Sequence, residues 1–246
     1  MERIGIDVST HQGNINWTKV KGNIDFAIIR AGYGKNNIDK QAANNVRGCE
    51  ANGIPYGFYW FSYAYTAEMA RKEAEYLINF IGEHKPSYPL YFDFEYDSVN
   101  YANKNGITIT KELLSSMATA FCETLEKAGF YAGIYANADY IENKFNSEIF
   151  KKYDLWYAYW NNKCNLAVNL WQYTSSGSVP GISGNVDMNK CYIDFPNIMV
   201  SNNLNGYNSN NTANNNSENT SNAKPNTNIC ECKCKCEYCP CVNRKV

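Results

Sequence analysis

The sequence predicts an α/β fold: an irregular barrel of the TIM type with an incomplete ring of helices, followed by a linker and a short Cys-rich tail. Two observations lead to this fold class. Apolar and aromatic runs of strand length recur through the first 195 residues, and helix patterns separate most of the early runs. Strands that alternate with helices favour parallel pairing, and near-continuous apolar strands fit a sheet that is covered on both faces.

The strand candidates come first. They span residues 3–8, 26–34, 55–63, 89–96, 130–137, 154–160, 167–173 and 186–194. Eight parallel strands close a barrel of the TIM type, in which catalytic groups lie at the carboxyl ends of the strands. The late strands are joined by short or Gly-rich connections, such as TSSGSVPGISGN at 174–185. The barrel is therefore expected to be irregular.

Three helices are expected between the early strands, over residues 39–52, 67–82 and 111–128. Thr66 and Thr110 precede the second and third helices, where a hydroxyl can accept a hydrogen bond from a free backbone N–H group. Gly129 is suited to end the third helix. The buried stripe of that helix is expected to consist of Leu113, Leu114, Met117, Phe121 and Leu125.

A change of composition near residue 198 predicts the domain organisation. Residues 1–198 are expected to form the barrel. Residues 199–229 are dominated by Asn, Ser and Thr, and they are expected to form a flexible linker because they lack apolar side chains. Residues 230–246 hold six of the ten cysteines. Their spacing suits a thiolate metal cluster, disulfides that bridge two chains, or a tail without function.

Charge and hydropathy exclude several classes of partner. A formal net charge of -1 and a pI near 6.2 give no broad attraction for nucleic acid or for an anionic membrane. No apolar run is long enough to span a membrane. The opening residues MERIGIDVST show no signal peptide, so we expect synthesis in the cytoplasm. The scattered cysteines are expected to be reduced core thiols: Cys49, Cys122, Cys164 and Cys191.

Acidic residues interrupt the strand pattern YPLYFDFEYDSV at 88–99. Asp93 and Glu95 are two apart, so on a strand they project from the same face. Their repulsion costs stability unless water, a partner or a substrate uses it. In a barrel, both side chains are expected to project into the mouth, the open end where the parallel strands finish. Asp7 ends the first strand in the same way, and a loop is expected to bring Asp187 of GNVDMN across the mouth.

Paired carboxylates suit glycoside hydrolysis, in which one acid protonates the leaving oxygen and the other stabilises positive charge at the anomeric carbon. Each negative neighbour raises the pKa of a carboxyl group and so keeps one of them protonated. The same four acids are also oxygen ligands that suit a hard cation. A zinc site is disfavoured because His11 and His84 are the only histidines. We interpret His11 as a structural loop residue and Asp97 as lying beyond the strand end.

Several segments together resemble a known family: GIDVSTHQGNINW at 5–17, FAIIRAGYG at 26–34, GIPYGFYWFSYA at 53–64 and PLYFDFE at 89–95, with AGFYAGIYAN, LWYAYW, LWQYT and GNVDMN further on. The chain resembles the family 25 glycoside hydrolases, the Chalaropsis-type lysozymes or N-acetylmuramidases, over about residues 3–195. The resemblance implies an irregular β/α barrel. It also implies cleavage, with retention of configuration and without a cofactor, of the β-1,4 bond between N-acetylmuramic acid and N-acetylglucosamine in peptidoglycan.

The resemblance also implies roles for single residues. Glu95 matches the general acid/base, and Asp93 matches the carboxylate that acts either as nucleophile or as orienter of the 2-acetamido group. Asp7 and Asp187 match acids that position the substrate or tune this pair. Substrate-binding side chains are expected in the motifs that line the family's groove, namely Tyr59, Tyr135, Trp171 and Gln172.

Two other functions stay open at this stage. One is a carbohydrate-binding barrel without catalysis, which would not need Glu95. The other is a metal-buffering protein that acts through its Cys-rich tail. For a muramidase without a signal peptide, we expect a phage endolysin that is released to the cell wall by a holin; a host enzyme that is exported by another route is the alternative.

Overall fold

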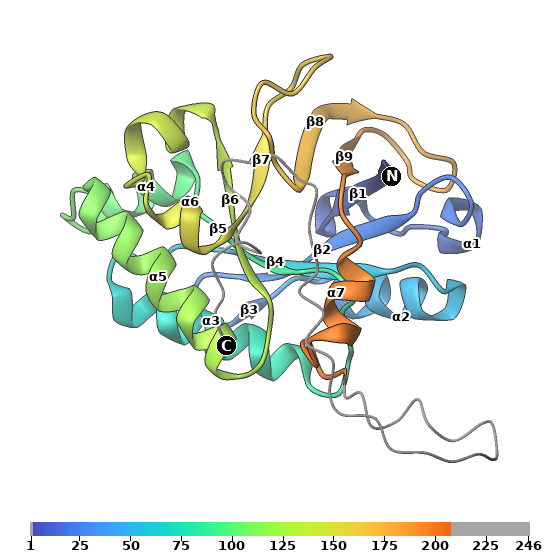
Figure 1. Ribbon diagram of the computed structural model, residues 1–246, viewed down its shortest axis with the longest axis horizontal. Helices are drawn as coiled ribbons and strands as arrows, with labels where there is room; N and C mark the ends of the chain where they lie inside the picture. The colour runs from blue at the N-terminus through green and yellow to red at the C-terminus, as the bar shows by residue number, and fades with distance from the viewer. Residues whose placement is uncertain (1, 208–246) are drawn as a thin grey trace, which may run out of the picture.

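The computed structural model describes residues 2–207, and a closed barrel forms its centre (Figure 1). Nine strands form one sheet, and pairing of β1 with β2 closes eight of them into the barrel. The ninth, β3 (Asn37–Ile38), pairs with β2 alone. The predicted fold class is confirmed. The barrel strands are β1 (Arg3–Val8), β2 (Phe26–Tyr33), β4 (Tyr56–Phe61), β5 (Leu90–Asp93), β6 (Ala132–Asn137), β7 (Asp154–Ala158), β8 (Leu170–Gly177) and β9 (Val186–Cys191).

Strand β9 departs from the parallel pattern. It runs antiparallel to both of its neighbours, β8 and β1, whereas the other barrel pairs are parallel. Its first residues therefore lie at the end of the barrel where the other strands finish. Asp187 pairs directly with Asp7 in this register. A strand thus carries Asp187 to the mouth, where the sequence had suggested a loop.

Helices surround the barrel, and α3 and α5 lie side by side on one flank (Figure 1). Their predicted caps are confirmed: the hydroxyls of Thr66 and Thr110 accept hydrogen bonds from the N–H groups of Met69 and Leu113 at 3.1 and 3.2 Å. The helices are η1 (Thr10–Gln12), α1 (Trp17–Val20), α2 (Ala42–Asn52), α3 (Ala67–Ile81), α4 (Tyr96–Lys104), α5 (Lys111–Lys127), the π-helix η2 (Tyr140–Lys144), α6 (Ile149–Lys152) and α7 (Phe195–Ser201).

Two hydrophobic clusters build the core. The larger cluster packs the helices against the outside of the barrel, and the smaller one fills the barrel interior. Helix α7 adds to the interior cluster, because the ring of Phe195 packs on Tyr88 and Tyr131 with centroids 5.5 and 5.7 Å apart. These two tyrosines precede β5 and β6, so α7 closes the amino-terminal end of the barrel. The opposite end is left for the site.

Contacts with the barrel continue beyond residue 198, where the sequence had placed the domain boundary. Asn205 is fully buried, and its amide donates hydrogen bonds to the carbonyl oxygens of Pro86 and Tyr88 at 2.8 and 3.0 Å. The Tyr207 hydroxyl donates to the carbonyl of Lys85 at 3.0 Å. Most of the predicted linker, and the whole Cys-rich tail at 230–246, lie outside the described residues.

Across residues 2–207, no helix has the length and apolar character needed to cross a membrane. In the same range, no group of three or more His, Cys, Asp or Glu side chains is arranged to hold a metal ion. The cysteines of this part carry free thiols, and three of them are buried as expected for core thiols. Cys164 is the half-buried exception.

Candidate active site

A pocket of about 300 Å³ opens at the carboxyl ends of the parallel strands. The four predicted acids all line it, although they come from three strands and one helix start. They are Asp7, Asp93, Glu95 and Asp187. Three of the four predicted substrate-binding side chains line it as well, namely Tyr59, Tyr135 and Gln172. The fold thus gathers residues that are up to 180 positions apart in the sequence.

Asp93 and Glu95 face the same pocket, but not because they share one strand. Strand β5 ends at Asp93, which is 4% exposed, and Glu95 is the residue just before α4. The Glu95 N–H group donates to the Ser98 hydroxyl at 3.2 Å, which turns the chain into the helix. Asp97 falls in the exposed first turn of α4. The strand alternation used on the sequence was therefore wrong for Glu95, although its consequence is correct.

Burial and neighbouring charges raise the pKa of both members of this pair. Burial raises the pKa of Glu95 to about 7, and the negative charges of Asp187 and Asp97 add to the effect. Burial also raises the pKa of Asp93 well above its usual value, with further contributions from Glu95 and Asp7, while the Arg30 cation opposes the shift. Near neutral pH, the site therefore holds a protonated carboxyl that can act as an acid.

A network of amide and ring donors fixes Asp7. Its Oδ2 atom accepts hydrogen bonds from the side-chain amides of Gln172 and Asn189, at 2.9 and 2.8 Å. Gln172 in turn accepts from the Tyr135 hydroxyl at 3.0 Å, and Asn189 accepts from the Trp156 indole at 2.7 Å. Each amide is thereby held with its NH₂ group toward the carboxylate. Asp7 cannot rotate without breaking several buried hydrogen bonds.

Asp7 and Asp187 lie opposite each other in the register of β1 and β9. Burial is the largest cause of the raised pKa of both carboxyl groups. At Asp7 the negative charge of Asp187 adds to the rise, whereas the hydrogen bonds from Asn189 and Gln172 oppose it.

Strand alternation separates two neighbouring residues that the sequence had placed in one groove. Gln172 points into the barrel, whereas Trp171 belongs to the cluster outside it and does not line the pocket. The Trp171 indole donates to the carbonyl of Tyr159 at 2.7 Å. Successive side chains on a strand face opposite sides, so the two residues cannot share this pocket.

Three residues of the site escaped the sequence reasoning. Arg30 lines the pocket and pairs with buried Asp39 at 2.7 Å. Its signal was a cation inside the apolar run FAIIRAGYG. Asn189 is the last residue of the motif GNVDMN, but only Asp187 of that motif was assigned a role. Trp160, the last residue of LWYAYW, is 63% exposed, yet its indole donates to Gln172 at 3.1 Å. An exposed ring held in place beside a pocket suits contact with the face of a sugar.

Comparison with known proteins identifies the family of this barrel. The family model described as glycosyl hydrolases family 25 matches residues 6–182. The chain belongs to this family. The match includes Asp7, Asp93 and Glu95 and ends before Asp187. Family 25 membership agrees with the resemblance drawn from the sequence motifs.

Similar proteins include lysozymes and autolysins. The autolytic lysozyme of Clostridium acetobutylicum is 27% identical over 192 residues, which cover 76% of this chain and 55% of the relative. The structure of a Streptomyces coelicolor lysozyme is 26% identical with a TM-score of 0.68, covering 82% of this chain and 97% of that one. The Streptococcus pneumoniae autolysin LytC, solved with a synthetic peptidoglycan ligand, is 29% identical with a TM-score of 0.68, covering 78% of this chain and 47% of LytC. This chain thus spans about half the length of LytC and of the Clostridium enzyme.

Proposed function

We propose that this family 25 chain is a lysozyme that hydrolyses the β-1,4 bond between N-acetylmuramic acid and N-acetylglucosamine in bacterial peptidoglycan. The observation that carries the proposal is the clustering of four carboxyl groups in one pocket, with the pKa of Glu95 raised to about 7. The names of the similar lysozymes and the peptidoglycan ligand of LytC support the same substrate class.

In the proposed mechanism, Glu95 donates its proton to the glycosidic oxygen as the bond breaks, and it then accepts a proton from the attacking water. Asp93 stabilises the positive anomeric centre, either as nucleophile or by orienting the 2-acetamido group. Arg30 opposes the rise in the Asp93 pKa and so favours the ionised form that this role needs. Asp7, which the amides of Gln172 and Asn189 hold in place, and Asp187 are proposed to position the sugar.

Digestion of purified peptidoglycan tests the proposal. The protein is expected to release reducing sugar ends steadily, without releasing new amino groups from peptide bonds. A barrel that binds carbohydrate without catalysis would retain the wall fragments and release reducing ends only at the background rate. New amino groups without reducing ends would assign the protein to peptide-bond hydrolysis and contradict the proposal.

The rate is expected to fall as the pH rises above about 7, because Glu95 must be protonated to act as the acid. Initial rates on soluble peptidoglycan fragments between pH 5 and 9 measure this alkaline limb of the pH–rate profile. Asp97→Asn provides a specific check, since the Asp97 charge raises the Glu95 pKa. That variant should lose activity at a lower pH than the wild type. If Asp97→Asn loses activity at the same pH as the wild type or at a higher pH, Glu95 is not the titrating acid.

Loss of the exposed Trp160 ring is expected to weaken substrate binding. Trp160→Ala should raise KM for peptidoglycan about 3- to 10-fold, the range expected for one aromatic stacking contact. Trp160→Phe keeps a ring and should lose less than the Ala variant. Steady-state kinetics on soluble fragments measure both. Equal KM values for wild type and Trp160→Ala would remove this ring from the binding surface.

A further inference from the structure

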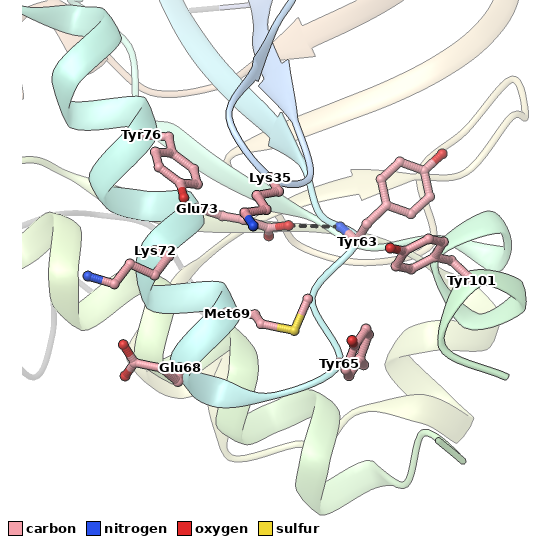
Figure 2. A pocket seen from close by; sticks show the side chains of 9 residues that line it. All are labelled: Lys35, Tyr63, Tyr65, Glu68, Met69, Lys72, Glu73, Tyr76 and Tyr101. Carbon is pink, nitrogen blue, oxygen red and sulfur yellow. Dashed lines mark hydrogen bonds between the residues drawn. The ribbon is translucent and has the colours of Figure 1, made fainter. Parts of the chain in front are cut away.

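A second pocket, of about 500 Å³, lies between α3 and the segment that follows β4 (Figure 2). Tyrosine rings form much of its wall, among them Tyr63, Tyr76 and Tyr101. The carboxyl group of Glu73, from α3, lies at the centre of the side chains drawn in Figure 2. The proposed mechanism gives this acid no part.

Glu73 is an unusual residue for its surroundings. It is 3% exposed, and within residues 2–207 no cationic side chain lies at ion-pair distance from it. Burial raises its pKa to about 7. Its Oε1 atom accepts a hydrogen bond from the backbone N–H group of Tyr63 at 3.0 Å, drawn as the dashed line in Figure 2. A buried acid without a cationic partner costs stability, so the contact that it makes needs an explanation.

The segment that Glu73 holds leads directly to the catalytic pocket. Strand β4 ends at Phe61, which lines that pocket and pairs with Asp93 in the sheet. The next three residues, 62–64, follow the end of β4, and the backbone N–H group of each has its own hydrogen-bond acceptor. The N–H of Ser62 donates to the Asp93 carbonyl at 2.7 Å, that of Tyr63 to Glu73, and that of Ala64 to the Ser62 hydroxyl at 3.2 Å.

These contacts connect α3 to Asp93 within two residues of chain. Ser62 and Ala64 are fully buried, so their backbone groups cannot turn to water if an acceptor is lost. Without Glu73, the Tyr63 N–H loses its acceptor, and we expect the segment to rotate until this group finds another partner. Because Ser62 is the next residue, this rotation moves the group that holds the Asp93 backbone.

We propose that Glu73 is a positioning residue for the proposed lysozyme reaction: its carboxyl group fixes the segment Ser62–Ala64, and this segment fixes Asp93. The inference rests on the proposed function for its kinetic consequence, whereas the placement of Asp93 by Glu73 does not depend on it. Glu73 acts through the hydrogen bond that it accepts and does not touch the substrate.

Variants at Glu73 test the proposal. Glu73→Met removes the acceptor at nearly equal length and should lower kcat on peptidoglycan about 10- to 100-fold, the loss expected when a catalytic group moves by about 1 Å, with KM changed less than about 2-fold. Glu73→Gln keeps an oxygen that accepts from Tyr63 and should restore most of kcat. Glu75→Met is the matched control, because this half-exposed residue of the same helix pairs only with Lys72 among its salt-bridge contacts. It should leave both constants unchanged.

A folded Glu73→Met protein with wild-type kcat, or a folded Gln variant as slow as the Met variant, would overturn the proposal. Should the Met variant not fold, Glu73→Asp replaces it, since the shorter side chain reaches Tyr63 only if the segment moves; a wild-type kcat there would also contradict us. If the wild type itself releases no reducing ends, the proposed function fails separately. A crystal structure of the Met or Asp variant then decides: we expect the 2.7 Å hydrogen bond from Ser62 to Asp93 to be broken, and an intact bond refutes the positioning role.

Discussion

Replacement of Glu95 by Gln is expected to lower kcat on peptidoglycan by about 10²- to 10⁴-fold, the usual contribution of a general acid. An amide has nearly the same shape as the carboxyl group but has no proton to transfer at the glycosidic oxygen. The fold should persist, because the change removes a repulsive charge from a crowded pocket. Initial rates of reducing-end release, together with circular dichroism spectra, measure both effects.

The matched control for this variant is Glu83→Gln, an exposed site after α3 that does not line the catalytic pocket. It should turn over peptidoglycan at the wild-type rate. If Glu95→Gln is folded and also keeps the wild-type rate, then Glu95 is not the acid, and another carboxyl group of the pocket must take that role.

Asp93→Asn is expected to lower kcat by more than about 100-fold, because a neutral amide cannot stabilise the positive anomeric centre as a carboxylate does. The reaction needs this charge in a place where the fold disfavours it. Asp93 is buried, its pKa is raised well above the usual value, and its Oδ1 atom has no hydrogen-bond partner among the described residues. Steady-state kinetics should show the loss in kcat.

The same substitution should stabilise the protein at alkaline pH. Folding raises the pKa of Asp93 above its unfolded value of 3.8, so the folded state binds the proton more tightly. Stability is therefore lost as the pH rises from about 4 through the folded pKa. Asn does not titrate, so the free energy of unfolding of the variant should rise relative to that of the wild type over this range. The gain should be about 1.4 kcal/mol for each unit by which folding raises the pKa of Asp93. Urea unfolding at pH 4 and pH 8 measures it. The free energy of unfolding of the variant, minus that of the wild type, should be larger at pH 8 than at pH 4. A smaller difference at pH 8 would contradict this role of Asp93.

Much of the barrel follows from local sequence patterns. The strand from Arg3 to Val8 was predicted with its observed bounds, and the hydroxyl caps of α3 and α5 lie where the sequence placed them. Two features did not follow. The antiparallel direction of β9 depends on how the last strand closes the barrel, which no local pattern records. Helix α4 begins within the expected strand, because the turn at Glu95 outweighs the apolar run before it.

The site was predictable where acids interrupt apolar strands. Asp7 and Asp93 lie at strand ends that point into the barrel, and this position alone favours a functional role. The supporting residues were harder to recognise. Asn189 matters because it holds Asp7 across 182 positions of sequence, and Glu73 because it accepts a hydrogen bond from the backbone of Tyr63. Such roles depend on tertiary contacts, which residue type and spacing do not reveal.

Glu95 and Asp93 are proposed to cleave the glycosidic bond on the muramic acid side. Reduction of the products of peptidoglycan digestion, followed by mass analysis of the new ends, identifies the bond that is cut. We expect reduced N-acetylmuramic acid at the new ends, formed by the wild type and lost in Glu95→Gln. Reduced N-acetylglucosamine ends, or fragments cut only at peptide bonds, would contradict this proposal.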